Sequence, residues 1–127
     1  MRLVHAREFV ITEPEGDINV NETRDALLLA AQAAERAGEA DMLFDCRRVT
    51  SDMSLGEITS LVHMMLTHRA LFGRKVAILA PLGQKLETMK FMEDFAVNRG
   101  LEVGAFGDYE QALEWLMPST RIAHAAE

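Results

Sequence analysis

Apolar and polar residues follow one another along this chain in short blocks, and these blocks predict alternating strands and helices. Strands are expected where short apolar segments stand between polar turns, at residues 42–46, 76–79 and 101–106. Phe9-Val10-Ile11-Thr12 is a β-branched and aromatic run that also favours a strand. Either one strand or a hairpin over residues 3–12 fits this pattern. Residues 76–79 are apolar at every position, which is typical of a strand buried on both faces of a parallel sheet.

The first helix is predicted from composition and from residues suited to its two ends. Residues 22–37 are nearly all strong helix formers, rich in Ala and Leu. Asn19, which stands three residues before Glu22, can cap the N-terminus, and Asn21 is the alternative cap. Gly38 can end the helix, because glycine readily adopts the left-handed conformation found just after many helices.

Three further helices are predicted by the same signals. Ser54-x-x-Glu57 has the spacing of a capping box, and the apolar face that follows it predicts a helix ending near residues 71–73. A third helix is expected over residues 85–99. The fourth starts after Asp108 and ends before Pro118, which cannot continue a helix.

The predicted order is a strand followed by a helix, four times over. Strands separated by helices of this length form parallel β-α-β units. The sequence therefore predicts a single small α/β domain over residues 1–117, with about four mainly parallel strands and four helices. Residues 118–127 are expected to form a flexible tail, because they offer little apolar surface to offset the entropy lost on ordering.

Composition and charge narrow the classes of function. Hydrophobic residues make up 49% and charged residues 26% of the chain, which is ordinary for a soluble domain. No apolar run approaches the roughly 20 residues that cross a bilayer, and the N-terminus lacks the apolar core of a signal peptide. With a single cysteine, Cys46, these features favour the cytoplasm. The net charge of −7 argues against a nucleic-acid partner, because such binding depends on Lys and Arg.

The most informative stretch is the predicted strand at residues 42–46 with the polar loop that follows it. Open α/β sheets bind ligands beyond the carboxyl ends of their strands, and Asp45 lies at that end. We expect Asp45 either to fix the loop by accepting hydrogen bonds from residues 49–54 or to contact a ligand. The candidate surface for a partner or ligand consists of Asp45, Arg47, Arg48, Thr50, Ser51, Asp52 and Met53.

The reactive residues do not form a recognisable catalytic or metal-binding set in the sequence. Cys46 lies beside two arginines that can lower its pKa, but no histidine is aimed at it by spacing, so an inert buried thiol is favoured. His63 and His68 are five residues apart, which is not the i,i+4 spacing of a helical metal pair. We therefore expect no catalytic residue, no metal and no cofactor. An enzyme that uses Asp45, Cys46 or a histidine is the third hypothesis.

Two further features bear on binding. The strand-to-helix turn at residues 79–85 offers N–H groups and Lys85 to an anion, although the glycine spacing of a nucleotide site is absent. Methionines gather on the second and third predicted helices, at Met53, Met64, Met65, Met89 and Met92. The adjacent Met64 and Met65 cannot share one helix face, so one of them is expected at a homodimer surface or a hydrophobic pocket.

Three motifs resemble the STAS or SpoIIAA-like family, the anti-sigma-factor antagonist fold. Leu43-Phe44-Asp45-Cys46-Arg47-Arg48-Val49 is similar to the family's apolar-apolar-Asp-x-x-x-Val signature. Ser54-Leu55-Gly56 stands where the family commonly opens a helix. Phe106-Gly107-Asp108-Tyr109-Glu110-Gln111-Ala112-Leu113-Glu114-Trp115-Leu116 resembles its Phe-x-Asp-x-x-x-Ala-x-x-Trp-Leu ending. The likeness covers about residues 3–117.

This resemblance implies a small sheet with helices mainly on one side and a regulatory or protein-binding role without catalysis. In family members that act as switches, a partner kinase phosphorylates a serine at the helix start, which corresponds to Ser54 here. The preceding family residue is usually Asp, whereas this chain has Met53, with Asp52 one position earlier. An N-cap role alone also explains Ser54. The implied protein partner is a kinase or an anti-sigma-type regulator. Lipid-binding relatives of the CRAL-TRIO type make a small apolar ligand the alternative.

Overall fold

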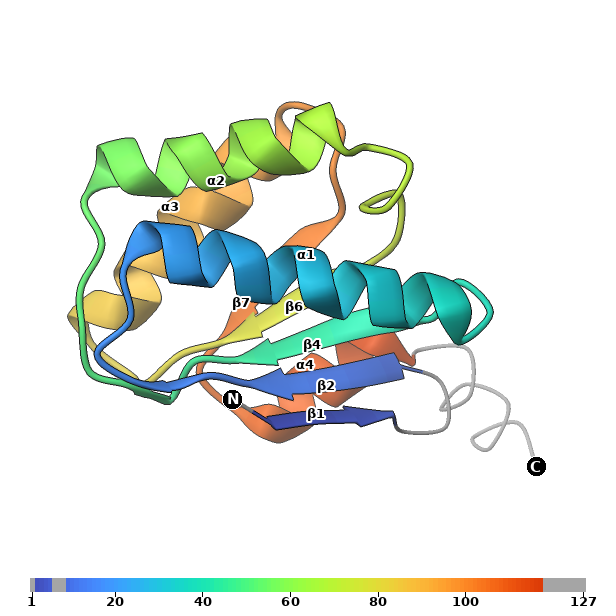
Figure 1. Ribbon diagram of the computed structural model, residues 1–127. Coiled ribbons are helices and arrows are strands. Elements are labelled where there is room, and N and C mark those ends of the chain that lie inside the picture. Colours follow the sequence, from blue (N-terminus) through green and yellow to red (C-terminus); the bar gives the residue numbers. More distant parts are fainter. Residues whose placement is uncertain (1, 6–8, 118–127) are drawn as a thin grey trace.

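A computed structural model describes residues 2–5 and 9–117 of the chain, and this part forms a small α/β domain (Figure 1). Its main sheet has the strand order β1-β2-β4-β6-β7. These strands are β1 (Arg2–His5), β2 (Phe9–Glu13), β4 (Asp41–Asp45), β6 (Val76–Leu79) and β7 (Val103–Phe106). The predicted α/β fold with a mainly parallel sheet is confirmed. The expected tail at residues 118–127 lies outside the described residues.

The first segment forms a hairpin, which was one of the two possibilities that the sequence left open. β1 pairs with β2 in antiparallel register, with Leu3 opposite Thr12. All other neighbouring pairs in the main sheet are parallel. A second, two-stranded parallel ladder joins β3 (Glu15–Gly16) to β5 (Arg48–Val49). These two short strands had no pattern in the sequence, because a two-residue strand is too short to show alternation.

Three of the helices in the described part of the chain begin at the predicted caps, and the third in chain order begins after Gly83 without a side-chain cap. The helices of this part are α1 (Val20–Arg36), α2 (Leu55–Thr67), α3 (Gln84–Val97) and α4 (Tyr109–Leu116). Asn19 caps α1 with a reciprocal capping box to Glu22, and Ser54 caps α2 in the same way with Glu57. Asp108 caps α4 by accepting from the Gln111 N–H.

One predicted helix end is wrong. The apolar pattern extends α2 to residues 71–73, but the helix ends at Thr67. Beyond it the Leu71 and Phe72 N–H groups both donate to the His68 carbonyl, at 2.8 and 3.2 Å, so the chain forms a turn. That turn places Phe72 in the core at 1% exposure, which explains why its apolar side chain continues the pattern without continuing the helix.

Three of the described helices cover one face of the main sheet and α4 covers the other (Figure 1). Side chains alternate between these faces along each strand. Met42 and Phe44 pack under α1, α2 and α3, whereas Leu43 packs with Ala112 and Leu116 of α4. The same alternation determines which helices the side chains at the end of β4 face.

Candidate functional site

The carboxyl ends of β2, β4 and β6 lie at the same edge as the N-termini of α1, α2 and α3 (Figure 1). The loop at residues 46–54 crosses this edge from β4 to α2. We call it the β4–α2 loop. All but one of the site residues predicted from the sequence belong to it, and the remaining one, Asp45, is the last residue of β4. The loop therefore decides what this edge can bind.

Asp45 is clamped to the next turn of chain and faces the α4 side of the sheet. Its Oδ1 accepts from the Arg47 backbone N–H at 3.1 Å and from Arg47 Nε at 3.0 Å, and its Oδ2 accepts from Nη2 at 3.0 Å. Asp45 is buried, while the Arg47 guanidinium lies 6.0 Å from the ring centroid of Tyr109 in α4. The side-chain hydrogen bonding that Arg47 donates to the Asp45 carboxylate raises the pKa of Arg47. Of the two roles expected for Asp45, this geometry is that of a structural clamp, but its partner is Arg47 and not residues 49–54.

Arg48 and Thr50 are exposed, and their backbones tie the β4–α2 loop to the segment before α1. Arg48 pairs with Glu15 in the short parallel ladder, and the Thr50 N–H donates to the Gly16 carbonyl at 2.9 Å. Gly16 has a φ of 82°, a left-handed conformation that favours glycine. These contacts fix the loop backbone and leave the side chains of Arg48 and Thr50 toward solvent.

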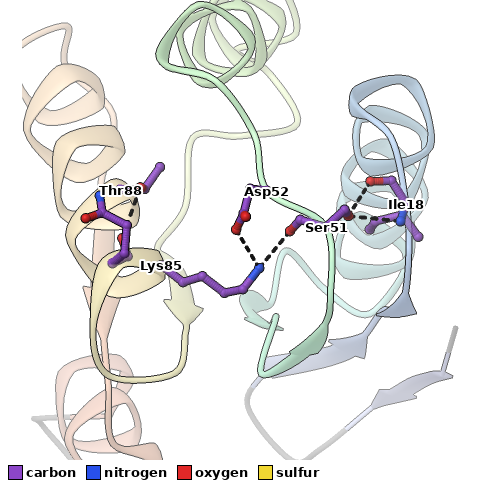
Figure 2. Close-up of polar contacts among 6 residues, drawn as sticks. Ile18, Ser51, Asp52, Lys85 and Thr88 are labelled. Carbon is purple, nitrogen blue, oxygen red and sulfur yellow. Dashed lines mark hydrogen bonds and ion pairs between the residues drawn. The ribbon is translucent and has the colours of Figure 1, made fainter.

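Ser51 and Lys85 hold the loop between α1 and α3 (Figure 2). The Ser51 hydroxyl donates to the Ile18 carbonyl at 2.6 Å and accepts from the Ile18 N–H at 3.0 Å. Lys85 Nζ donates to the Ser51 carbonyl at 2.8 Å and to Asp52 Oδ1 at 2.9 Å. The loop is thus connected to the start of α1 on one side and to the first turn of α3 on the other.

Ser54 is exposed, and its side chain belongs to the α2 capping box. Its Oγ accepts from the Glu57 N–H at 3.1 Å, while Glu57 Oε1 accepts from the Ser54 N–H at 2.9 Å. This is the N-cap geometry that the sequence predicts. The preceding Met53 is half-buried and packs against the core.

A cleft of about 430 Å³ lies between the β4–α2 loop and the first turns of α1, α2 and α3. Its size is within the range of small-molecule sites. The lining is Ile18, Thr23, Phe44, Cys46, Val49, Ser51, Asp52, Met53, Ser54, Leu55, Ala80, Pro81, Gln84, Lys85, Thr88 and Met89. Cys46 faces this cleft, whereas its neighbour Asp45 faces α4, because adjacent residues at a strand end alternate between faces.

Sequence reasoning identified only part of this cleft. Met53 and Met89 line it, although the sequence predicted Met64 or Met65 at a pocket or dimer surface. Met64 lines a separate hollow between α1 and α2, and Met65 is buried in the core. Ile18 and Thr88 carried no sequence signal. Lys85 stood out as an anion-binding residue, but its contact with a loop more than thirty positions earlier is a tertiary feature with no local pattern.

The environment of Cys46 favours the protonated thiol at neutral pH. Burial, and to a smaller extent the Asp45 carboxylate, raise its pKa from 9.0 to about 12, while Lys85 acts in the opposite direction. The lowering that the two arginines could have caused is absent, and Arg47 is engaged by Asp45 on the other face of the sheet. His63 and His68 line the hollow between α1 and α2, away from Cys46. Among the side chains that the structure describes, no three of His, Cys, Asp or Glu are placed to hold a metal ion.

Over the described residues, none of the helices combines the length and the apolar character that crossing a bilayer requires.

Comparison with known proteins adds no family assignment. No protein-family model matches the sequence, and a search of curated proteins returns no match.

Proposed function

We propose that this chain is a non-enzymatic, STAS-like regulatory module that binds a protein partner in the cytoplasm through the β4–α2 loop and the start of α2. One observation carries the proposal: two large apolar side chains are exposed at this edge of the sheet. Leu55, at the start of α2, is 55% exposed, and Leu82, in the loop after β6, is 80% exposed. Exposed apolar side chains beside a polar loop are a common feature of partner-binding surfaces.

The partner that we propose is a regulator of the anti-sigma type, with a kinase that phosphorylates Ser54. The Ser54 side chain is exposed and flanked by the carboxylates of Asp52 and Glu57. A phosphate there would add about −1.5 to −2 charge. It would meet the N–H groups and the positive dipole end of α2, and it would repel a partner surface that carries negative charge. Phosphorylation would in this way release the partner.

The experiment is capture of partners from native cell extract by the whole chain, with identification by mass spectrometry. We expect a protein that is retained by the wild type and lost with Leu82→Ser, with Leu55→Ser and with Ser54→Asp. The matched control is Leu29→Ser, because Leu29 is a 46% exposed leucine on α1. Equal retention by all four variants would contradict the proposal. Sedimentation of the same variants identifies a homodimer if the retained partner is a second copy.

A second candidate function is binding of a small apolar ligand, and the cleft is the observation that favours it. Phe44, Ala80 and Met89 form a buried apolar floor, and Leu55 stands at the rim. Native mass spectrometry of protein isolated gently from its own cells should then show an added mass. Thr88→Phe, which places a ring in the cleft, should remove that mass. An unliganded wild-type protein would count against this candidate.

A further inference from the structure

We propose that the cleft binds an aliphatic monocarboxylate, with the hydrocarbon chain on the apolar floor and the carboxylate on Lys85. This inference rests on the second candidate function, since it names the class of ligand for the same cleft.

The apolar part of the ligand is indicated by the floor and walls. Phe44, Ala80 and Met89 are 2%, 1% and 9% exposed, and each lines the cleft. Val49 and Met53 add apolar surface from the β4–α2 loop. A floor of this kind stabilises a hydrocarbon chain by removing it from water, at about 0.8 kcal/mol for each buried CH₂ group.

The acidic part of the ligand is indicated by charge. Among the described residues that line the cleft, Lys85 is the cation and Asp52 the anion. An ammonium group has three N–H donors. Two of those on Lys85 reach the Ser51 carbonyl and Asp52, and the described part of the chain offers no acceptor to the third. A carboxylate at the cleft mouth would supply one.

The present partner of Lys85 is easily replaced. The Asp52 side chain is 84% exposed, whereas that of Lys85 is 32% exposed. Asp52 can therefore turn into water at little cost, because an exposed ion pair is worth only about 0–1 kcal/mol. A ligand carboxylate would then take its place on Lys85 in a drier setting, and the charge of the site would stay balanced. One ammonium matches one negative charge, which favours a carboxylate over a doubly charged phosphate.

The test uses sodium octanoate, 1-octanol and octyl phosphate as probes, titrated into the whole chain and followed by calorimetry and by amide chemical shifts. We expect octanoate to bind on the order of tenfold more tightly than octanol, because of the two only octanoate offers a negative charge to the Lys85 ammonium. Lys85→Met should abolish this difference, because the described residues of the cleft then offer no cation to the octanoate carboxylate. Asp52→Asn should strengthen octanoate binding several-fold, since it removes the competing carboxylate.

Lys90→Met is the matched control, because Lys90 is an exposed lysine on α3 that lines a different hollow. It should bind all probes as the wild type does. Equal affinity for octanoate and octanol, or tighter binding of octyl phosphate, would overturn the carboxylate assignment. The small-ligand function would still stand in either case if Thr88→Phe abolished octanol binding. If neither octanoate nor octanol shifted amide signals around the cleft, the carboxylate assignment and the small-ligand function would both be wrong.

Discussion

Arg74 and Lys85 lie at opposite ends of the parallel strands and contact the same kinds of acceptor, but they differ in how far they are exposed to solvent. At the amino edge, Arg74 donates to the Ala40 carbonyl at 3.1 Å and to Glu35 Oε2 at 2.7 Å. At the carboxyl edge, Lys85 likewise donates to one carbonyl and one carboxylate. The Arg74 side chain is only 6% exposed, but that of Lys85 is 32% exposed over an open cleft.

This difference separates a structural cation from one that is available for binding. Arg74 is enclosed, and its contacts join the end of α1 to the strand β6. Lys85 makes its contacts beside a cleft, to a carboxylate that is almost fully in solvent. One carbonyl and one carboxylate are thus the acceptors at both edges. They stabilise the fold around the buried Arg74 but leave a replaceable contact at the exposed Lys85, because the free energy of a polar contact depends on its burial.

The largest effect is expected from a matched pair of substitutions. Arg74→Met should lower the free energy of unfolding by about 2 kcal/mol, because it removes two hydrogen bonds made by a buried guanidinium, one of them to a carboxylate. Lys85→Met should change it by less than about 1 kcal/mol, as for an exposed ion pair. Urea denaturation of both variants measures the difference. Equal losses at the two sites would remove the distinction between the two edges.

The second prediction concerns Asp45, which lies at the same edge as the cleft but makes structural contacts on the other face of the sheet. Asp45→Ala should cost about 1–3 kcal/mol, because it removes three contacts made by a buried carboxylate. Octanoate affinity should stay near the wild-type value, since Asp45 faces α4 and not the cleft. Urea denaturation and calorimetry on one sample test both parts. A large loss of octanoate affinity with unchanged stability would place Asp45 in the binding site.

A smaller effect is expected at the start of α2. Ser54→Ala should lower stability by about 1 kcal/mol, since it removes the side-chain acceptor of the capping box. Ser54→Gly should cost only a few tenths of a kcal/mol, because glycine is itself tolerated at the N-cap. Thermal denaturation of both variants checks this order. If Ser54→Gly were the more damaging of the two, the capping explanation of Ser54 would be wrong.

The comparison of the two edges also shows what the sequence can and cannot predict. Asn19, Ser54 and Asp108 are local signals, and each begins a helix where it was expected. The contact between Lys85 and Asp52 has no such signal, because it joins residues 33 positions apart. The cleft itself is lined by residues from α1, β4, β5, α2 and α3 and from the loops between them, so no single segment carries its pattern.

The position of Asp45 illustrates a finer limit. The sequence places it at a strand end, where ligands bind in open sheets. Whether Asp45 faces a ligand depends on which face of the sheet it occupies. The inner strands β6 and β4 are buried on both faces of the sheet. Strands that are apolar on both sides carry no alternation to separate the faces. The assignment of Asp45 to the α4 side, and of Cys46 to the cleft, therefore required the structure.

The smallest effect is expected at Cys46, and it appears only in alkali. Because burial holds the pKa of the folded thiol at about 12, against 9.0 ordinarily, the unfolded chain loses its proton first as pH rises. The thiol thus favours folding fully below about pH 9, and this contribution is lost as pH rises from 9 toward 12. Cys46→Ala removes the titration, so the wild type should lose more stability than this variant between pH 8 and about pH 10 in urea denaturation.

A chemical measurement separates this effect from the other groups that titrate in alkali. At pH 8 a thiol reagent should modify Cys46 slowly in the folded protein and rapidly in urea, because the thiolate is the reacting form. Octanoate should slow the reaction further if it covers the cleft, whereas Lys85→Met should remove that protection. Lys85 lowers the pKa of Cys46, so the same variant should also slow the reaction of the free protein. Rapid modification of the folded wild type at pH 8 would contradict the raised pKa of Cys46.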